Sequence, residues 1–283
     1  MKRRHTLALA ATPLGLSALP SAAAQGGGKK VLRVSFRTAE TGFDPAQIND
    51  IYSRTVTPHI FEAPYQYDPL ARPSLVRPLT ADGMPEHADN YKTWTVKIRP
   101  GIYFADDPAF KGAKRELVAQ DYVYAYKRFA DPLVKSPAWT WLETYEFLGL
   151  IEARKLAIDS KKPFDYDTPM EGIAAIDRYT IRFRLASPRP RFITGVLCAS
   201  DLLGGVAREV VEFYGDKIPG HPVGTGPFKL VQWRRSSFIA LECNPGYREL
   251  LYDASPAPDD AEGWSMLARS YTAQGKYADA LPA

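Results

Sequence analysis

Several segments of the chain alternate apolar and polar residues with the period of a β-strand. The three clearest are residues 31–36, 94–99 and 179–185. Residues 228–233 and 238–243 are also rich in aromatic and aliphatic side chains, and residues 234–237 between them have the length of a hairpin loop. The pattern therefore predicts five strands, of which the last two pair as a hairpin.

Residues 119–129 follow instead the period of an amphipathic helix. Tyr122, Tyr126 and Phe129 fall on one face at i, i+4 and i+7. We interpret this aromatic stripe as core and not as a ligand site, because any packed helix needs such a face. Val118 stands where a Thr would accept a hydrogen bond from the first turn, so we expect the start of the helix to be weakened by about 1 kcal/mol.

Two glycines and a proline make residues 224–227 a tight turn before the predicted hairpin. We expect the glycines to adopt positive φ and Pro227 to fix the backbone before the strand begins. No Lys-Ser or Lys-Thr pair follows, and no helical pattern opens after the turn, which argues against a phosphate-binding loop. Asn244, Pro245 and Gly246 end the second strand of the hairpin.

The first residues have the pattern of a secretory signal peptide. Basic residues 2–4 precede an apolar stretch at 6–19, and three alanines at 22–24 form a cleavage site before Gln25. The apolar stretch is too short to span a bilayer. We therefore predict a signal peptide at residues 1–24. Because no Cys follows the cleavage site, we expect a soluble periplasmic protein without a lipid anchor.

The composition is that of a globular protein able to form a core. Apolar residues make up 45% of the chain, charged residues 24%, and the formal net charge is +4. Lys and Arg are interspersed with Asp and Glu, without the basic stripe that nucleic-acid binding needs. Cys198 and Cys243 could form a disulfide in an oxidising compartment, but we favour two buried free thiols.

No pattern of catalytic or metal-ligating residues stands out. The sequence has no G-x-S-x-G or H-E-x-x-H motif, and its histidines have no companion Cys or His at metal-ligand spacing. We interpret the neighbouring acids Asp106 and Asp107 as surface or helix-capping residues. A periplasmic hydrolase would need a nucleophile and a base within reach, and the sequence offers neither. We expect no enzymatic activity, no cofactor and no metal.

Residues 221–247 read HPVGTGPFKLVQWRRSSFIALECNPGY and closely resemble the signature of family 5 of the extracellular solute-binding proteins. This family contains the oligopeptide, dipeptide and nickel receptors of ABC importers. Asp44-Pro45, the pattern at 94–104 and the helix at 119–129 are similar to earlier segments of the family, in the same order. The resemblance implies an α/β, periplasmic binding protein-like fold (type II, cluster of three-domain peptide receptors).

The resemblance covers residues 30–252, about the first half of such a receptor, so we expect the fold to be incomplete. We expect residues 30–58 and 174–252 to form an incomplete main α/β lobe, whose mixed sheet includes the hairpin. Residues 59–173 would form a smaller inserted domain. The opposing lobe has no counterpart in the sequence, and we expect weak peptide binding or none.

The resemblance also places Asn49, Asp50 and Ile51 beside bound solute, because the segment after Asp44-Pro45 lines the cleft of such receptors. A polar turn or cap at Asn49 and Asp50 is an equal alternative. The implied function is the periplasmic substrate-binding component of an ABC importer, with an inner-membrane permease as partner. Among solutes, a peptide is favoured over nickel or haem.

The pattern changes after Tyr252. Residues 254–258 are linker-like, and the residues that follow have the spacing of a tetratricopeptide repeat. The positions that fit are Trp264, Leu267, Ala268, Tyr271, Gly275, Tyr277 and Ala280. We expect residues 254–283 to be a linker and truncated repeat-like helices, similar to repeats of cytochrome c-type biogenesis proteins, with an ordinary amphipathic helix as the alternative.

Such a tail indicates a truncated or chimeric protein. In an alternative function, the fusion binds no solute and its repeat-like tail mediates protein–protein interaction.

Overall fold

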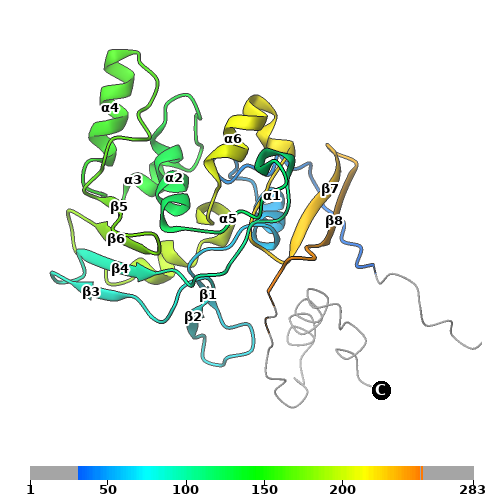
Figure 1. Cartoon of the computed structure of the whole chain (residues 1–283), viewed down its shortest axis with the longest axis horizontal. Coiled ribbons are helices and arrows are strands. Elements are labelled where there is room, and N and C mark those ends of the chain that lie inside the picture. The colour runs from blue at the N-terminus through cyan, green and yellow to red at the C-terminus, as the bar shows by residue number, and fades with distance from the viewer. Residues whose placement is uncertain (1–30, 249, 251–283) are drawn as a thin grey trace, which may run out of the picture. The chain divides into compact units, whose positions relative to one another are not determined.

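The computed structural model describes residues 31–248 and 250 of the 283-residue chain (Figure 1). The predicted signal peptide at 1–24 and the predicted linker and repeat at 254–283 lie outside these residues. The chain divides into one unit that ends at Val34 and a second unit that begins at Ser35. All helices and strands of the described residues belong to the second unit.

The second unit mixes short helices with antiparallel strands. The α-helices are α1 (Ile51–Val56), α2 (Ala119–Ala130), α3 (Trp139–Glu143), α4 (Leu150–Ser160), α5 (Ser200–Leu203) and α6 (Arg208–Tyr214). The strands are β1 (Tyr65–Tyr67), β2 (Val76–Pro78), β3 (Glu86–Ala88), β4 (Thr93–Lys97), β5 (Ile173–Ala175), β6 (Thr180–Arg184), β7 (Phe228–Arg234) and β8 (Phe238–Cys243). Short 3-10 segments are η1 (Pro45–Gln47), η2 (Thr57–His59), η3 (Pro108–Phe110) and η5 (Gly215–Gly220), and η4 (Ile193–Leu197) is a π-helix.

The largest sheet has four antiparallel strands in the order β3-β4-β6-β5. Trp94 of β4 lies opposite Phe183 of β6, and Val96 lies opposite Ile181; all four side chains are buried. The two strands predicted from the alternation at 94–99 and 179–185 are therefore confirmed. Each strand buries one face in the core.

Helix α2 packs against strands β5 and β6 of this sheet (Figure 1). Its residues Tyr122, Tyr126 and Phe129 are fully buried, which confirms that the aromatic stripe is core. Val118 at the N-cap provides no side-chain acceptor, as expected. Its backbone N–H donates instead to the carboxylate of Asp121 at 2.8 Å, so one half of a capping box remains.

The four-stranded sheet crosses the boundary that we expect near residue 174 between the main lobe and the inserted domain. Strand β6 pairs with β4, which comes from the 59–173 segment, and β5 pairs with the other edge of β6. The sheet thus places residues 173–184 with that segment. The division of the chain into lobes stays a prediction.

Residues 31–36 form no strand, so the strand predicted there from the alternation is wrong. Val31, Leu32 and Val34 are each more than half exposed. A strand is stabilised by hydrogen bonds to a neighbour, and none of the sheets among the described residues contains this segment.

Strands β7 and β8 form the predicted hairpin, with a register shift between Leu230 and Gln232. Leu230, Trp233 and Ile239 of the hairpin pack on a second cluster of buried side chains. That cluster contains Phe43, Val56, Ile60, Phe61, Tyr124, Ala125 and Val206. The buried carboxylate of Glu40 accepts hydrogen bonds from Trp233 Nε1 and from the backbone N–H of Ser236, which fixes the hairpin loop.

The glycines of the 224–227 turn do not adopt positive φ, contrary to our expectation. They are needed because another backbone segment passes very close. A Cβ on Gly224 would lie 2.0 Å from the carbonyl oxygen of Ile60, and a Cβ on Gly226 would lie 2.6 Å from that of His59. The backbone N–H of Gly226 also donates to Ile60 O at 2.8 Å. The turn is therefore a site of close backbone packing.

Candidate functional site

The predicted site residues Asn49, Asp50 and Ile51 lie at the start of α1. Asp50 is the N-cap of this helix: its carboxylate accepts the backbone N–H of Ser53 at 2.8 Å and the hydroxyl of Thr41 at 2.5 Å. Burial raises the pKa of Asp50, but the hydrogen bonds from Ser53 and Thr41 lower it more, and the pKa lies below its ordinary value. The charged carboxylate therefore holds the helix start.

The two neighbours of Asp50 face solvent. Ile51 is 72% exposed and Asn49 is also exposed. An exposed aliphatic side chain beside an exposed amide can contact the side chains and the backbone of an extended peptide. The side chains of Asn49 and Ile51 are thus exposed to solvent, while the side chain of Asp50 caps the helix.

Helix α1 is anchored to α5 from below this turn. The guanidinium of Arg54 donates to the Asp201 carboxylate at 2.6 Å, and the hydroxyl of Thr57 donates to the Asp201 carbonyl at 2.9 Å. These contacts join segments that are far apart in the sequence and fix the last turn of α1.

A buried ion pair fixes the Asp44-Pro45 turn that leads into this site. Both carboxylate oxygens of Asp44 accept from Arg128 of α2, at 2.5 and 2.7 Å, and the two side chains are 1% and 3% exposed. Asp44 also caps η1 through the backbone N–H of Ala46. No local pattern in the sequence indicates this partner, which lies 84 residues away.

Glu62 is the centre of a second buried network that the sequence did not indicate. Its carboxylate, 2% exposed, accepts from the hydroxyls of Thr225 and Tyr247 at 2.8 and 3.0 Å. The guanidinium of Arg248 donates to both carboxylate oxygens at 2.8 and 2.9 Å, and to Leu79 O at 3.1 Å. The network joins the close-packed turn to the segment after β8.

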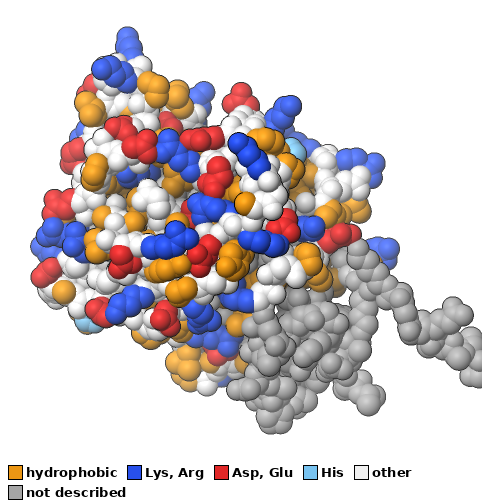
Figure 2. Space-filling model, in the orientation of Figure 1, with side chains coloured by type: hydrophobic (Ala, Val, Ile, Leu, Met, Phe, Trp, Pro, Cys, Tyr) orange, Lys and Arg blue, Asp and Glu red, His pale blue; other side chains and the backbone are white. Residues whose placement is uncertain are grey.

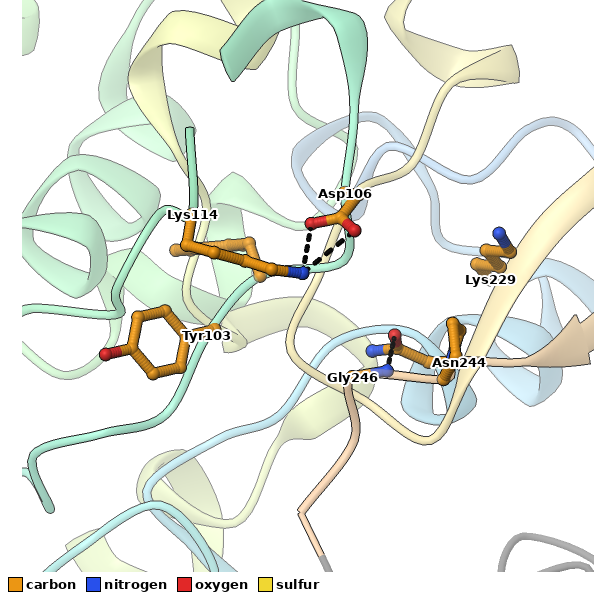
Figure 3. A pocket seen from close by; sticks show the side chains of 8 residues that line it. Tyr103, Asp106, Lys114, Lys229, Asn244 and Gly246 are labelled. Atoms are coloured by element: carbon orange, nitrogen blue, oxygen red, sulfur yellow. Dashed lines mark hydrogen bonds and ion pairs between the residues drawn. The ribbon is translucent and has the colours of Figure 1, made fainter. Parts of the chain in front are cut away.

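A pocket of about 230 Å³ lies beside the turn that ends β8 (Figure 3). It is lined by Tyr103, Phe104, Asp106, Lys114, Lys229, Asn244, Pro245 and Gly246. The ammonium of Lys114 donates to both oxygens of Asp106 at 2.7 and 2.9 Å. The predicted roles of the two neighbouring acids are confirmed: Asp106 forms this surface pair, and Asp107 caps η3 through Ala109 N.

The two cysteines differ from the expectation of two buried thiols. No disulfide joins them, but Cys243, the last residue of β8, is exposed. Cys198 is half-buried, and burial raises the pKa of its thiol to about 11. A thiol with so high a pKa is a poor nucleophile at neutral pH.

We also searched the described residues for metal-binding groups, membrane-spanning helices and single-sign charged surfaces. Among residues 31–248 and 250, no group of three or more His, Cys, Asp or Glu side chains could hold a metal ion. None of the helices in this part of the chain is long and apolar enough to cross a membrane. Acidic and basic side chains are interleaved on the face shown in Figure 2.

The sequence matches one known protein family. The family described as bacterial extracellular solute-binding proteins, family 5 Middle, matches residues 76–262, which is more than half of the chain. The chain belongs to this family. The match runs past Tyr252, after which we expected an unrelated segment, and it ends before all of the positions with repeat-like spacing.

Curated relatives of this family 5 chain bind peptides, by their names. The periplasmic oligopeptide-binding protein OppA of Salmonella typhimurium is 30% identical over 208 residues, which are 72% of this chain and 34% of the relative. The di/tripeptide-binding protein 2 of Pseudomonas aeruginosa is 26% identical over 226 residues, which are 77% of this chain and 38% of the relative. The chain thus spans little more than a third of the length of these relatives.

Solved structures confirm the periplasmic peptide-binding fold. Haemophilus influenzae OppA in complex with RPPGFSPFR matches with a TM-score of 0.60 at 25% identity, over 74% of this chain and 37% of that one. Burkholderia pseudomallei OppA matches with a TM-score of 0.57 at 28% identity, over 74% and 37%. The predicted fold class is therefore correct for the described part of the chain.

Proposed function

We propose that this chain is the substrate-binding component of an ABC importer and that its solutes are oligopeptides. The observation that carries the proposal is the likeness to Haemophilus influenzae OppA in complex with RPPGFSPFR, at a TM-score of 0.60. The 30% identity to Salmonella typhimurium OppA supports the same class of solute. The chain would perform no chemistry and would pass the peptide to a permease in the inner membrane.

In this proposal, Asn49 and Ile51 contact the peptide, and Asp50 holds them in place. The amide of Asn49 can donate to and accept from a peptide backbone, and the exposed Ile51 can cover an apolar side chain. The Asp44–Arg128 pair and the Arg54–Asp201 pair fix this wall from the protein side.

Peptide titration followed by NMR tests the proposal on the chain from Gln25 onward. We expect saturable shifts with a tripeptide, and several-fold weaker binding in Asn49→Ala and Ile51→Ala variants. Leu156→Ala, on the exposed face of α4, is the matched control because its side chain is also largely exposed. Absence of saturable binding, or equal effects of all three substitutions, would contradict the proposal.

We also propose export to the periplasm, based on the predicted signal peptide and on relatives named as periplasmic proteins. Mass spectrometry of the exported protein should show a chain that begins at Gln25. A mature protein that retains residues 2–24 would rule out the assignment.

The repeat-like spacing after residue 262 supports the second hypothesis, in which the tail mediates protein–protein interaction. If the tail alone carried the function, neither the full chain nor a chain without residues 254–283 would bind peptide, and the shortened chain would lose its protein partner. Loss of peptide binding in this deletion would instead assign the tail to the solute site.

A further inference from the structure

The pocket beside the turn after β8 is separate from the predicted peptide-contacting residues. None of Asn49, Asp50 and Ile51 lines it. Its walls come from the segment around residues 103–106, from Lys114, from β7 and from the turn at 244–246 (Figure 3). Its volume of about 230 Å³ lies below the range of about 300–1,000 Å³ that is usual for drug-sized ligands. A group about the size of one amino-acid residue would fill it.

The charges that line the pocket favour a monoanion. Two lysines face one aspartate, which gives a formal charge of +1. Lys114 is already neutralised by Asp106. In Figure 3 no hydrogen bond or ion pair joins Lys229 to another lining residue. Glu242 lies opposite Lys229 in the hairpin register but does not line the pocket. Lys229 is therefore the cation that can pair with a ligand.

The remaining walls favour an apolar body. Phe104 is buried, Tyr103 is 43% exposed, and Pro245 adds an aliphatic ring. The amide of Asn244 is committed to the protein, since its Nδ2 donates to Gly226 O at 3.0 Å and its Oδ1 accepts Gly246 N at 3.1 Å. Polar recognition is thus left to Lys229, while the rings offer apolar contact.

We propose that this pocket binds a small monocarboxylate with an aromatic or aliphatic body. The carboxylate pairs with Lys229, and the apolar body lies against Tyr103 and Pro245. The pocket would bind this ligand whether or not the chain transports peptides.

Titration of the full chain with N-acetylphenylalanine, and with its uncharged amide as the matched ligand, tests the proposal by NMR. We expect weak, saturable binding of the acid at the residues that line the pocket. The amide should bind about fivefold more weakly, since an exposed ion pair contributes up to about 1 kcal/mol. Added salt should weaken binding of the acid and leave binding of the amide unchanged.

Three variants separate charge from packing. Lys229→Gln should remove the preference for the acid, whereas Asp106→Asn should strengthen binding of the acid because it releases Lys114. Tyr103→Ala should weaken both ligands to the same degree. Lys155→Gln, an exposed lysine of α4, is the control and should change nothing.

Either of two affinity results would overturn the proposal. One is equal binding of acid and amide to the unmodified chain. The other is a preference for the acid that survives in a Lys229→Gln variant with a native circular dichroism spectrum. Shifts that map away from the pocket would overturn it as well.

Discussion

Asp44 and Arg128 are the most deeply buried ion pair among the described residues, and they explain how the turn before α1 is held. Each side chain is at most 3% exposed, and two short hydrogen bonds join them. Taking two charges out of water is costly, and the pair compensates only while both partners are present. Removing one partner leaves the other charged and buried.

We expect Arg128→Met to lower the free energy of unfolding by about 3–5 kcal/mol, because it leaves Asp44 unpaired in the core. The double variant with Asp44→Ala should lose less than the sum of the two single variants. Urea unfolding measures all three. Lys97→Met, which breaks the exposed pair with Glu86, is the control and should change stability by less than about 1 kcal/mol. Additive losses at Asp44 and Arg128 would show that the two charges are not coupled.

Gly224 makes a second prediction at the scale of one residue. A Cβ there would lie 2.0 Å from Ile60 O, so Gly224→Ala must push two backbone segments apart. We expect a loss of about 2 kcal/mol or more, and a melting temperature lower by about 4 °C or more. Gly246→Ala is the matched control, because the nearest atom to its Cβ would be 3.6 Å away. Equal melting temperatures for the two variants would refute the close-packing explanation.

At the scale of elements, α1 depends on its cap, since it has only six residues. Asp50→Ala should destabilise the protein by about 1 kcal/mol, whereas Asp50→Asn should keep most of the stability because Asn is also a good N-cap. Thermal melts compare the two. If Asp50→Asn keeps stability but loses peptide binding, then Asp50 contacts the solute directly and is more than a cap.

The same cap has a pH dependence. The pKa of Asp50 is lower in the folded protein than in the unfolded chain, so its contribution is fully present above the unfolded pKa and is lost as pH falls through the folded pKa. The free energy of unfolding of Asp50→Asn should therefore differ less from that of the unmodified protein at low pH than at neutral pH. A stability difference that is the same at every pH would contradict this.

Helix α2 offers a stabilising substitution. Val118 lies at the N-cap with extended backbone and accepts no hydrogen bond through its side chain. Val118→Thr has nearly the same shape and adds an acceptor, so we expect a gain of about 0.5–1 kcal/mol in chemical unfolding. Val231→Thr, at an exposed position of β7, is the control and should be neutral. A loss at Val118 would show that its methyl groups matter more than the missing cap.

For the whole molecule, we predict that the segment 254–283 adds little to the stability of the rest. Its helix candidate at residues 261–274 has a length that is marginal in isolation. Deletion of residues 254–283 should change the melting temperature by less than about 4 °C. A larger fall would mean that the tail packs on the folded part and is not an independent appendage.

The sequence by itself determined the local elements and the family. The alternation at 94–99 and 179–185, the helix at 119–129 and the hairpin around Trp233 were all predictable, because periodicity and turn residues act over a few neighbouring positions. The linear order of these motifs was enough to identify the family, and through it the fold class. The same resemblance predicts that Asn49, Asp50 and Ile51 lie beside bound solute, and this stays a prediction.

Only the tertiary structure decided which distant groups meet. The chain joins Asp44 to Arg128 and Glu62 to Arg248, and no local pattern marks either partner. Position 224 likewise requires a glycine because the backbone of Ile60 passes close to it. Residues 31–36 form no strand because none of the described sheets supplies a neighbouring strand. Ion pairing, close packing and strand pairing are properties of two segments at once, so one stretch of sequence does not specify them.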